Sequence, residues 1–180
     1  MTVPILIDLA PSLRDELWRH LLPRRFRWEE AAFVFAQGEK NEGNFTFRSL
    51  EWLPVPPSGF ASRSRYHFEL TDEARAAVIK RAHDLGASLV EFHSHTSRCA
   101  AAFSASDLSG FEEFVPHIFW RLRGRPYAAV VVTRSGIAGL AWLENPLDAG
   151  RLEGIIVGPR LLKATNLSSL GLDKYGRNQV

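Results

Sequence analysis

The sequence predicts an α/β fold of the mixed α+β kind, in which a single domain forms a mixed β-sheet flanked by helices. The chain has 180 residues, of which 46% are hydrophobic and 23% charged, and these values suit one domain with a sizeable core. Strand-like segments alternate with helical ones and others form hairpins, which favours both parallel and antiparallel pairing. We place the domain at residues 1–160 and expect residues 161–180 to be a C-terminal tail that is mobile or docks on a partner.

The first predicted elements are a strand, a helix and a hairpin, at residues 5–9, 12–22 and 29–53. Ser12 is a suitable helix N-cap, leucines recur every four residues after it, and Pro23 stops the helix. The valine and aromatic content of residues 29–36 indicates a strand. Residues 45–53 are its expected partner, because a polar loop containing glycine separates the two segments.

The next predicted elements are a strand at residues 63–70, a helix at residues 71–86 and a strand at residues 88–93. Thr71 and the acidic residues after it open the helix, and Gly86 closes it. A further helix follows Asp107 and is expected to end or kink at Pro116. The last elements are a hairpin of residues 127–133 and 137–143, and a strand or helical turn at residues 152–157.

The densest group of metal-binding residue types begins at Glu91 and runs through His93 and His95 to Asp107. Side chains alternate along a strand, so the two histidines project to the same side, about 6.6 Å apart along the backbone. Asp107 follows at the start of a helix, and a fold that returns this helix to the strand end supplies an oxygen ligand. Two histidines and one carboxylate leave a fourth position for water on a tetrahedral zinc ion. We therefore expect one catalytic zinc per chain.

A simpler interpretation of these residues is structural. Ser104 and Asp107 have the spacing of a helix N-terminus, with a serine cap and an acidic residue three positions later. His93 and His95 are then ordinary strand-end histidines. We favour the metal site, because the simpler interpretation needs two independent coincidences within a short stretch and leaves Glu91 unexplained.

In chain order the pattern is His-x-His, eight residues, and Ser-x-x-Asp, and here the chain resembles the JAMM (JAB1/MPN/MOV34) metalloproteases. The resemblance implies that His93, His95 and Asp107 hold zinc and that Ser104 supports the transition-state oxygen. It also implies the MPN/JAB fold, which is cytidine-deaminase-like. The family usually has a proline after the second histidine and seven residues before the serine, whereas this chain has Thr96 and a spacer of eight.

The same resemblance implies a glutamate upstream that acts on the water. Aligning the hydrophobic positions of the family's first core strand places this catalytic glutamate on Glu29, with Ala32 where the family often has glycine. Glu30 is the alternative base, one residue away and on the opposite face of a strand.

By resemblance, the function is that of a zinc-dependent isopeptidase or peptidase that removes or processes a ubiquitin-like protein at its C-terminus. Bacterial deubiquitinase-like members accompany ubiquitin-like proteins and their activating and conjugating enzymes, some in anti-phage systems. An extended substrate tail is expected to pair with a sheet edge near residues 37–47. Two alternatives stay open: a catalytically silent MPN scaffold, and a DNA-repair-associated protein similar to the RadC group.

Composition narrows the classes of partner. The formal net charge of +2 is small, which speaks against nucleic acid as the ligand. The longest apolar runs have six residues, far short of the roughly 20 that cross a bilayer, and the first residues do not resemble a signal peptide. We therefore expect a cytoplasmic protein. The single cysteine, Cys99, excludes an internal disulfide and is either a small packing residue or a reversible fourth zinc ligand.

Overall fold

The computed structural model describes residues 3–25, 27–165 and 167–168. Within these ranges the helices are α1 (Pro11–Leu21), α2 (Asp72–Leu85), α3 (Ala105–Arg121) and the short 3-10 turn η1 (Pro57–Gly59). The strands are β1 (Ile5–Leu9), β2 (Ala31–Lys40), β3 (Phe45–Pro54), β4 (Phe60–Arg63), β5 (Phe68–Leu70), β6 (Ser88–Ser94), β7 (Ala102–Phe103), β8 (Tyr127–Thr133), β9 (Gly136–Trp142), β10 (Ala149–Val157), β11 (Arg160–Lys163) and β12 (Leu167–Ser168).

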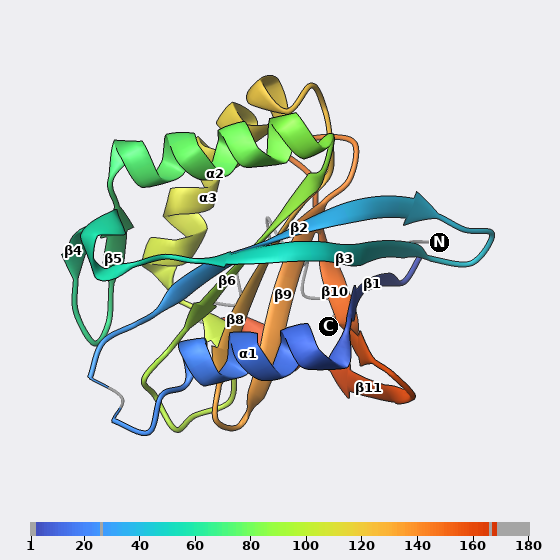
Figure 1. The fold of residues 1–180 in the computed structure, drawn as a ribbon. Helices are drawn as coiled ribbons and strands as arrows, with labels where there is room; N and C mark the ends of the chain where they lie inside the picture. The colour runs from blue at the N-terminus through green and yellow to red at the C-terminus, as the bar shows by residue number, and fades with distance from the viewer. Residues whose placement is uncertain (1–2, 26, 166, 169–180) are drawn as a thin grey trace.

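The main sheet closes on itself through its first strand. Its strand order is β1-β3-β2-β6-β8-β9-β10-β11, and β1 pairs in parallel with both β3 and β10 (Figure 1). Seven of the described strands therefore form a closed mixed barrel, with β11 paired to β10 outside the ring. Three α-helices accompany it within the described ranges.

Our predicted fold class, a helix-flanked mixed sheet with the cytidine-deaminase-like fold of an MPN/JAB domain, is wrong. The closing pairs, such as Ile7 with Ile155, join the two ends of the domain. Strand periodicity shows which segments are strands but not which distant strands pair, so the sequence contained no signal for closure.

Side chains of all seven barrel strands meet in one interior cluster. It includes Ile7, Val34 and Phe92, all fully buried, together with Leu17 and Leu21 of α1. Burying a side chain of this kind stabilises the folded chain by about 1.5–3 kcal/mol. The helix α1 thus completes the barrel interior with the leucine stripe that its sequence predicts.

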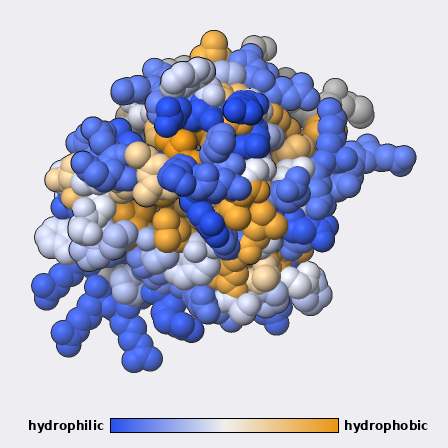
Figure 2. Space-filling model, turned by 45° about the horizontal axis from the view of Figure 1, so that its top comes forward, coloured by the Kyte–Doolittle hydropathy of each residue, from blue (hydrophilic) through white to orange (hydrophobic). Residues whose placement is uncertain are grey.

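The outer face of β2, β6, β8 and β9 is covered by α2 and α3. Phe33 and Phe35 of β2 project to this side and share a cluster with Ile79 of α2 and Val115 of α3. Because both faces of the central strands are covered, β2 begins with six buried residues and β8 is buried throughout. Figure 2 shows the molecule with the top of Figure 1 turned forward, where hydrophilic residues predominate and hydrophobic patches lie between them.

The observed helix ends can be compared with those that the capping residues and prolines predict. The Thr71 side chain accepts a hydrogen bond from the Ala74 amide, and Gly86 has a φ of 64°, so both predicted ends of α2 are confirmed. The helix α1 instead begins at Pro11, after Ala10 rather than Ser12. The helix α3 does not end at Pro116 but continues to Arg121.

Two predicted segments have a different organisation in the structure. Residues 63–70 are not one strand, because β4 and β5 form an antiparallel hairpin whose connection contains His67. The substrate edge expected near residues 37–47 is not open along Phe45–Phe47, since β3 pairs there with β1 on one side and β2 on the other. A substrate tail therefore cannot pair along Phe45–Phe47, whereas Gln37 to Lys40 of β2 pair with β3 on one side and lie beyond the segment that pairs with β6.

The predicted C-terminal tail begins inside a β-strand. The predicted tail starts at residue 161, within β11, and β12 pairs in parallel with β7. Residue 166 and residues 169–180 of that tail lie outside the described residues. In the part of the chain that the structure describes, no helix is long and apolar enough to span a membrane.

Candidate metal centre

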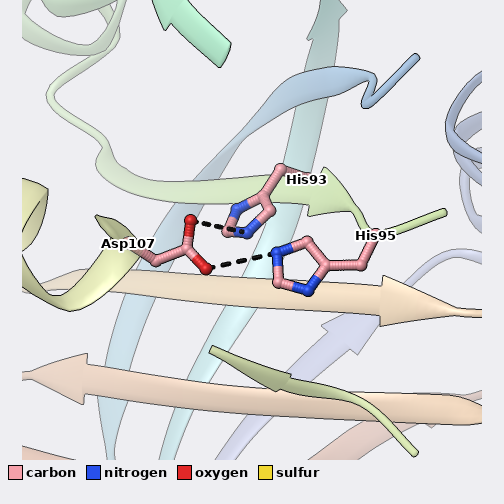
Figure 3. Close-up of side chains that lie close together, drawn as sticks. All are labelled: His93, His95 and Asp107. Carbon is pink, nitrogen blue, oxygen red and sulfur yellow. Dashed lines mark ion pairs between the residues drawn. The ribbon is translucent and has the colours of Figure 1, made fainter. Parts of the chain in front are cut away.

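His93, His95 and Asp107 lie together and can hold a metal ion. One potential ligand atom from each residue lies within 4.8 Å of the others. Nε2 of His93 is 3.6 Å from Oδ1 of Asp107, and Nε2 of His95 is 3.2 Å from Oδ2 of the same carboxylate (Figure 3). The two rings and the carboxylate converge on one point, as the strand spacing and the returning helix predict.

The barrel fixes the two histidines through backbone pairing on both sides of β6. His93 pairs with Ala31 of β2 and with Val131 of β8. The amide of His95 donates to the carbonyl of Val132 at 3.0 Å, and the amide of Ser94 donates to that of Glu30 at 2.9 Å. The strand end is therefore held in place before any ion binds.

Asp107 is held by the N-terminus of α3. The Ser104 hydroxyl oxygen accepts from the Asp107 amide at 3.1 Å, and Oδ2 of Asp107 accepts from the Ser104 amide at 2.7 Å. This reciprocal capping box is the structural interpretation of these two residues, and the structure contains it. The cap and the proposed ligand are compatible, because the same Asp107 carboxylate also faces both histidines.

The site is electrostatically suited to a cation. Burial of His93 alone lowers the pKa of its ring, but the Asp107 and Glu91 carboxylates outweigh burial and raise that pKa to about 10. Burial tends to raise the pKa of Asp107, but the two histidines hold it well below its usual range. Both His93 ring nitrogens are buried without a hydrogen-bond partner among the described residues. An ion at Nε2 satisfies one of them, so the donor set fits a metal.

Glu29 lies at the edge of this cluster. It is only 3% exposed, and its Oε1 is 3.9 Å from Nε2 of His95. Burial raises the pKa of Glu29, while attraction to His95 and His93 opposes the rise. Its amide donates to the carbonyl of Ser64 at 3.0 Å, which ties it to the β4–β5 connection.

Glu30, the alternative base, has a different partner. Its Oε2 accepts a hydrogen bond from Nη1 of Arg63 at 2.7 Å, and both side chains are mostly buried. Burial raises the pKa of Glu30 and the Arg63 guanidinium opposes the rise. The structure thus brings Glu29, and not Glu30, to the histidines.

Cys99 lies exposed in the loop between β6 and β7. Its amide donates to the Ser97 hydroxyl at 2.9 Å, which makes a tight local turn. Among the described residues, the cluster of potential ligands consists of His93, His95 and Asp107 and does not include this cysteine.

The β4–β5 hairpin borders the site, which the sequence did not reveal. Nδ1 of His67 is 3.1 Å from the Ser106 hydroxyl, and the Phe68 ring packs edge-on to His93 with centroids 5.5 Å apart. The Thr96 hydroxyl donates to the carbonyl of Arg65 at 2.9 Å. No spacing rule links this hairpin to the His-x-His motif, because the two segments meet only through the fold.

Glu91 and Tyr127 lie on the Nδ1 side of His93. Oε1 of Glu91 is 3.4 Å from Nδ1 of His93, and its Oε2 accepts from the Tyr127 hydroxyl at 2.7 Å. Burial, and then the Glu91 charge, raise the pKa of Tyr127 well above its usual value. The sequence analysis singled out Glu91 but assigned it no role, and it did not identify Tyr127. The one sequence feature that marks Tyr127 is a hydroxyl-bearing side chain in an otherwise apolar strand.

Comparison with known proteins adds little to this geometry. No protein-family model matches the sequence, and no curated protein matches it. The solution structure of a protein from Salinibacter ruber is similar at a TM-score of 0.44 and 20% identity, over 87% of this chain and 95% of that one. A similarity at this level carries no conclusion about function, which must come from the site.

Proposed function

We propose that the chain is a zinc-dependent peptidase or isopeptidase that cleaves an amide bond at the C-terminus of a ubiquitin-like protein. The observation that carries the chemistry is the convergence of His93, His95 and Asp107 with Glu29 buried beside them. The substrate class rests on the resemblance of the motif to the JAMM metalloproteases.

The donor set supports zinc as the ion. Two imidazole nitrogens and one carboxylate oxygen are a common catalytic zinc set, which leaves one position for water. When bound, zinc supplies a Lewis acid that lowers the pKa of a water towards about 7 and polarises a carbonyl. His93 is 1% exposed whereas the His95 side chain is 15% exposed, so solvent and substrate reach the site from the His95 side.

Glu29 carries the proton transfers in this proposal. Its carboxylate accepts a proton from the attacking water and delivers it to the departing amine, while a C–O bond forms and the C–N bond breaks. The raised pKa of Glu29 favours the first of these steps, because a more basic carboxylate is a better proton acceptor. Contributions of this kind accelerate reactions by about 10²–10⁴-fold.

Ser104 stabilises the oxygen of the attacked carbonyl. In the capping box its hydroxyl oxygen accepts a bond from the Asp107 amide, so the hydroxyl hydrogen is not used by that contact. That hydrogen is available to donate to the developing oxyanion. Donors in such positions contribute about 3–4 kcal/mol in other enzymes.

The test is cleavage of a fusion between a candidate ubiquitin-like protein and a reporter. Zinc-loaded protein is expected to cut directly after the terminal residue of the ubiquitin-like tail, and a chelator, His95→Ala or Asp107→Ala is expected to abolish cutting. His83→Ala is the matched control, because it removes a half-exposed histidine of α2 outside the cluster.

Three results contradict the proposal. Equal cleavage of short unrelated peptides indicates a general peptidase, because binding energy from a folded substrate should orient one carbonyl. Zinc binding without cleavage of any amide indicates a silent scaffold. Binding to DNA at physiological salt without cleavage indicates the repair-associated alternative.

A further inference from the structure

We propose that Glu91, held by Tyr127, is a positioning residue for His93: it accepts a hydrogen bond from Nδ1–H and so directs Nε2 to the metal. This inference rests on the metal site of the proposed function but not on the substrate. It assigns a role to a buried carboxylate that the hydrolytic mechanism does not use.

The first support is the direction of the His93 ring. Glu91 and His93 are two residues apart on β6, so their side chains project to the same face. Nδ1 of His93 faces Oε1 of Glu91 at 3.4 Å, while Nε2, on the other side of the ring, faces Asp107 at 3.6 Å. Each ring nitrogen therefore has one carboxylate before it.

The second support is the chemistry of a ligating imidazole. When Nε2 of a neutral histidine binds a metal, its proton resides on Nδ1, and an acceptor there fixes the tautomer and the ring orientation. The aromatic rings of Phe68 and Phe103, which also pack on His93, offer no acceptor. The present separation of 3.4 Å is about 0.5 Å longer than an ordinary N–H···O bond and Nδ1 has no hydrogen-bond partner among the described residues, so the proposed bond requires the two side chains to move closer when the ion binds.

The third support is the rigid placement of Glu91 itself. The Tyr127 hydroxyl donates to Oε2 at 2.7 Å, which leaves Oε1 for His93. Tyr127 is fully buried, and its ring packs against Phe114 and Trp142 with centroids 6.1 and 5.7 Å apart. A carboxylate buried at 7% exposure is costly unless it is hydrogen-bonded. The tyrosine meets that need and aims the other oxygen at the histidine.

The experiment compares zinc affinity, measured by competition with a chromophoric chelator, in wild type, Glu91→Gln, Glu91→Leu and Tyr127→Phe. Loss of the acceptor in Glu91→Leu is expected to weaken zinc binding about 10–100-fold. Glu91→Gln retains a neutral acceptor and is expected to lie between wild type and Glu91→Leu, with Tyr127→Phe closest to wild type. Glu51→Gln is the control, because it removes a carboxylate paired with Arg81 on the surface.

Two further measurements separate positioning from a merely structural role. The melting temperature of each metal-free variant reports stability, and the visible spectrum of the Co²⁺-loaded variant reports ligand geometry. A positioning role predicts a changed Co²⁺ spectrum in Glu91→Gln and Glu91→Leu, beyond any shift in melting temperature. Where a Glu91 variant does not fold, Tyr127→Phe carries the test.

Unchanged zinc affinity and an unchanged Co²⁺ spectrum in Glu91→Gln and Tyr127→Phe overturn the inference. A wild-type protein that takes up no zinc overturns both this inference and the proposed function. A wild type that binds zinc but cleaves no amide, with weakened binding in the Glu91 variants, overturns the proposed function alone.

Discussion

Oδ2 of Asp107 accepts a hydrogen bond from the amide of Ser104 at 2.7 Å, and the Ser104 hydroxyl accepts one from the Asp107 amide in return. Because the same carboxylate faces His93 and His95, the N-terminal cap of α3 and the candidate metal site share the Asp107 side chain. Substitutions at these two positions therefore affect helix stability and chemistry together, and matched variants are needed to separate the effects.

Ser104→Ala is expected to lower the free energy of unfolding of the metal-free protein by about 0.5–2 kcal/mol, as loss of an N-cap does. It is also expected to lower turnover about 10²–10³-fold while zinc stays bound, because an oxyanion donor is lost. Thr71→Ala is the matched control, since Thr71 caps α2 through the same type of bond. Equal turnover in the two variants would mean that Ser104 is a cap and nothing more.

Glu29→Gln is expected to reduce turnover by about 10²–10⁴-fold without loss of zinc, since it removes the group that carries the proton. Glu30→Gln is expected to act on stability instead, through its contact with Arg63. Turnover and zinc content of both variants are the measurements. If Glu30→Gln is inactive and Glu29→Gln is active, the general base is Glu30 and not Glu29.

Zinc affinity is expected to rise with pH. In the metal-free protein His93 has a pKa of about 10, so zinc must displace a proton from this ring at lower pH. Loss of this one proton makes zinc binding about tenfold tighter for each pH unit, until the pH approaches the pKa of His93. Asp107 is already ionised in this range, so it adds nothing to the pH dependence of zinc affinity. Competition titrations between pH 6 and 9 measure the slope, and calorimetry in two buffers counts the protons released. A flat profile contradicts the assignment of His93 as a ligand.

Ile7→Ala is expected to lower the free energy of unfolding by about 2–5 kcal/mol, because Ile7 is fully buried inside the barrel. Leu50→Ala is the control, since Leu50 is 51% exposed and should change stability by no more than about 0.5 kcal/mol. Urea unfolding of both variants gives the comparison. Similar midpoints for the two would argue against closure of the barrel by β1.

Cys99→Ala is expected to leave zinc affinity and basal turnover unchanged, because Cys99 is exposed and lies outside the cluster of potential ligands. The measurements are zinc affinity, by competition with a chelator, and the rate of cleavage at substrate concentrations below saturation. A rise in basal turnover would support the interpretation of Cys99 as a reversible fourth ligand.

Local signals predicted the parts of the molecule that depend on neighbours in the sequence. The capped ends of α2 at Thr71 and Gly86 follow from hydrogen bonds and backbone angles within a few residues. The common face of His93 and His95 follows from strand alternation, and the capping box of α3 from the spacing of Ser104 and Asp107. In each case the interacting groups lie within four residues of one another, so the sequence determines them by itself.

The tertiary structure alone decided the contacts between distant segments. The pairing of Ile7 with Ile155 closes the barrel, and the Tyr127 hydroxyl meets Glu91 across two paired strands. Glu29, just before β2, lies near His95, just after β6, because these two strands pair. Hydrophobic periodicity marks each strand but is the same whether a sheet stays open or closes, and it does not say which strands become neighbours. The sequence thus determined the set of potential metal ligands, while the closed barrel determined which carboxylates and which tyrosine surround it.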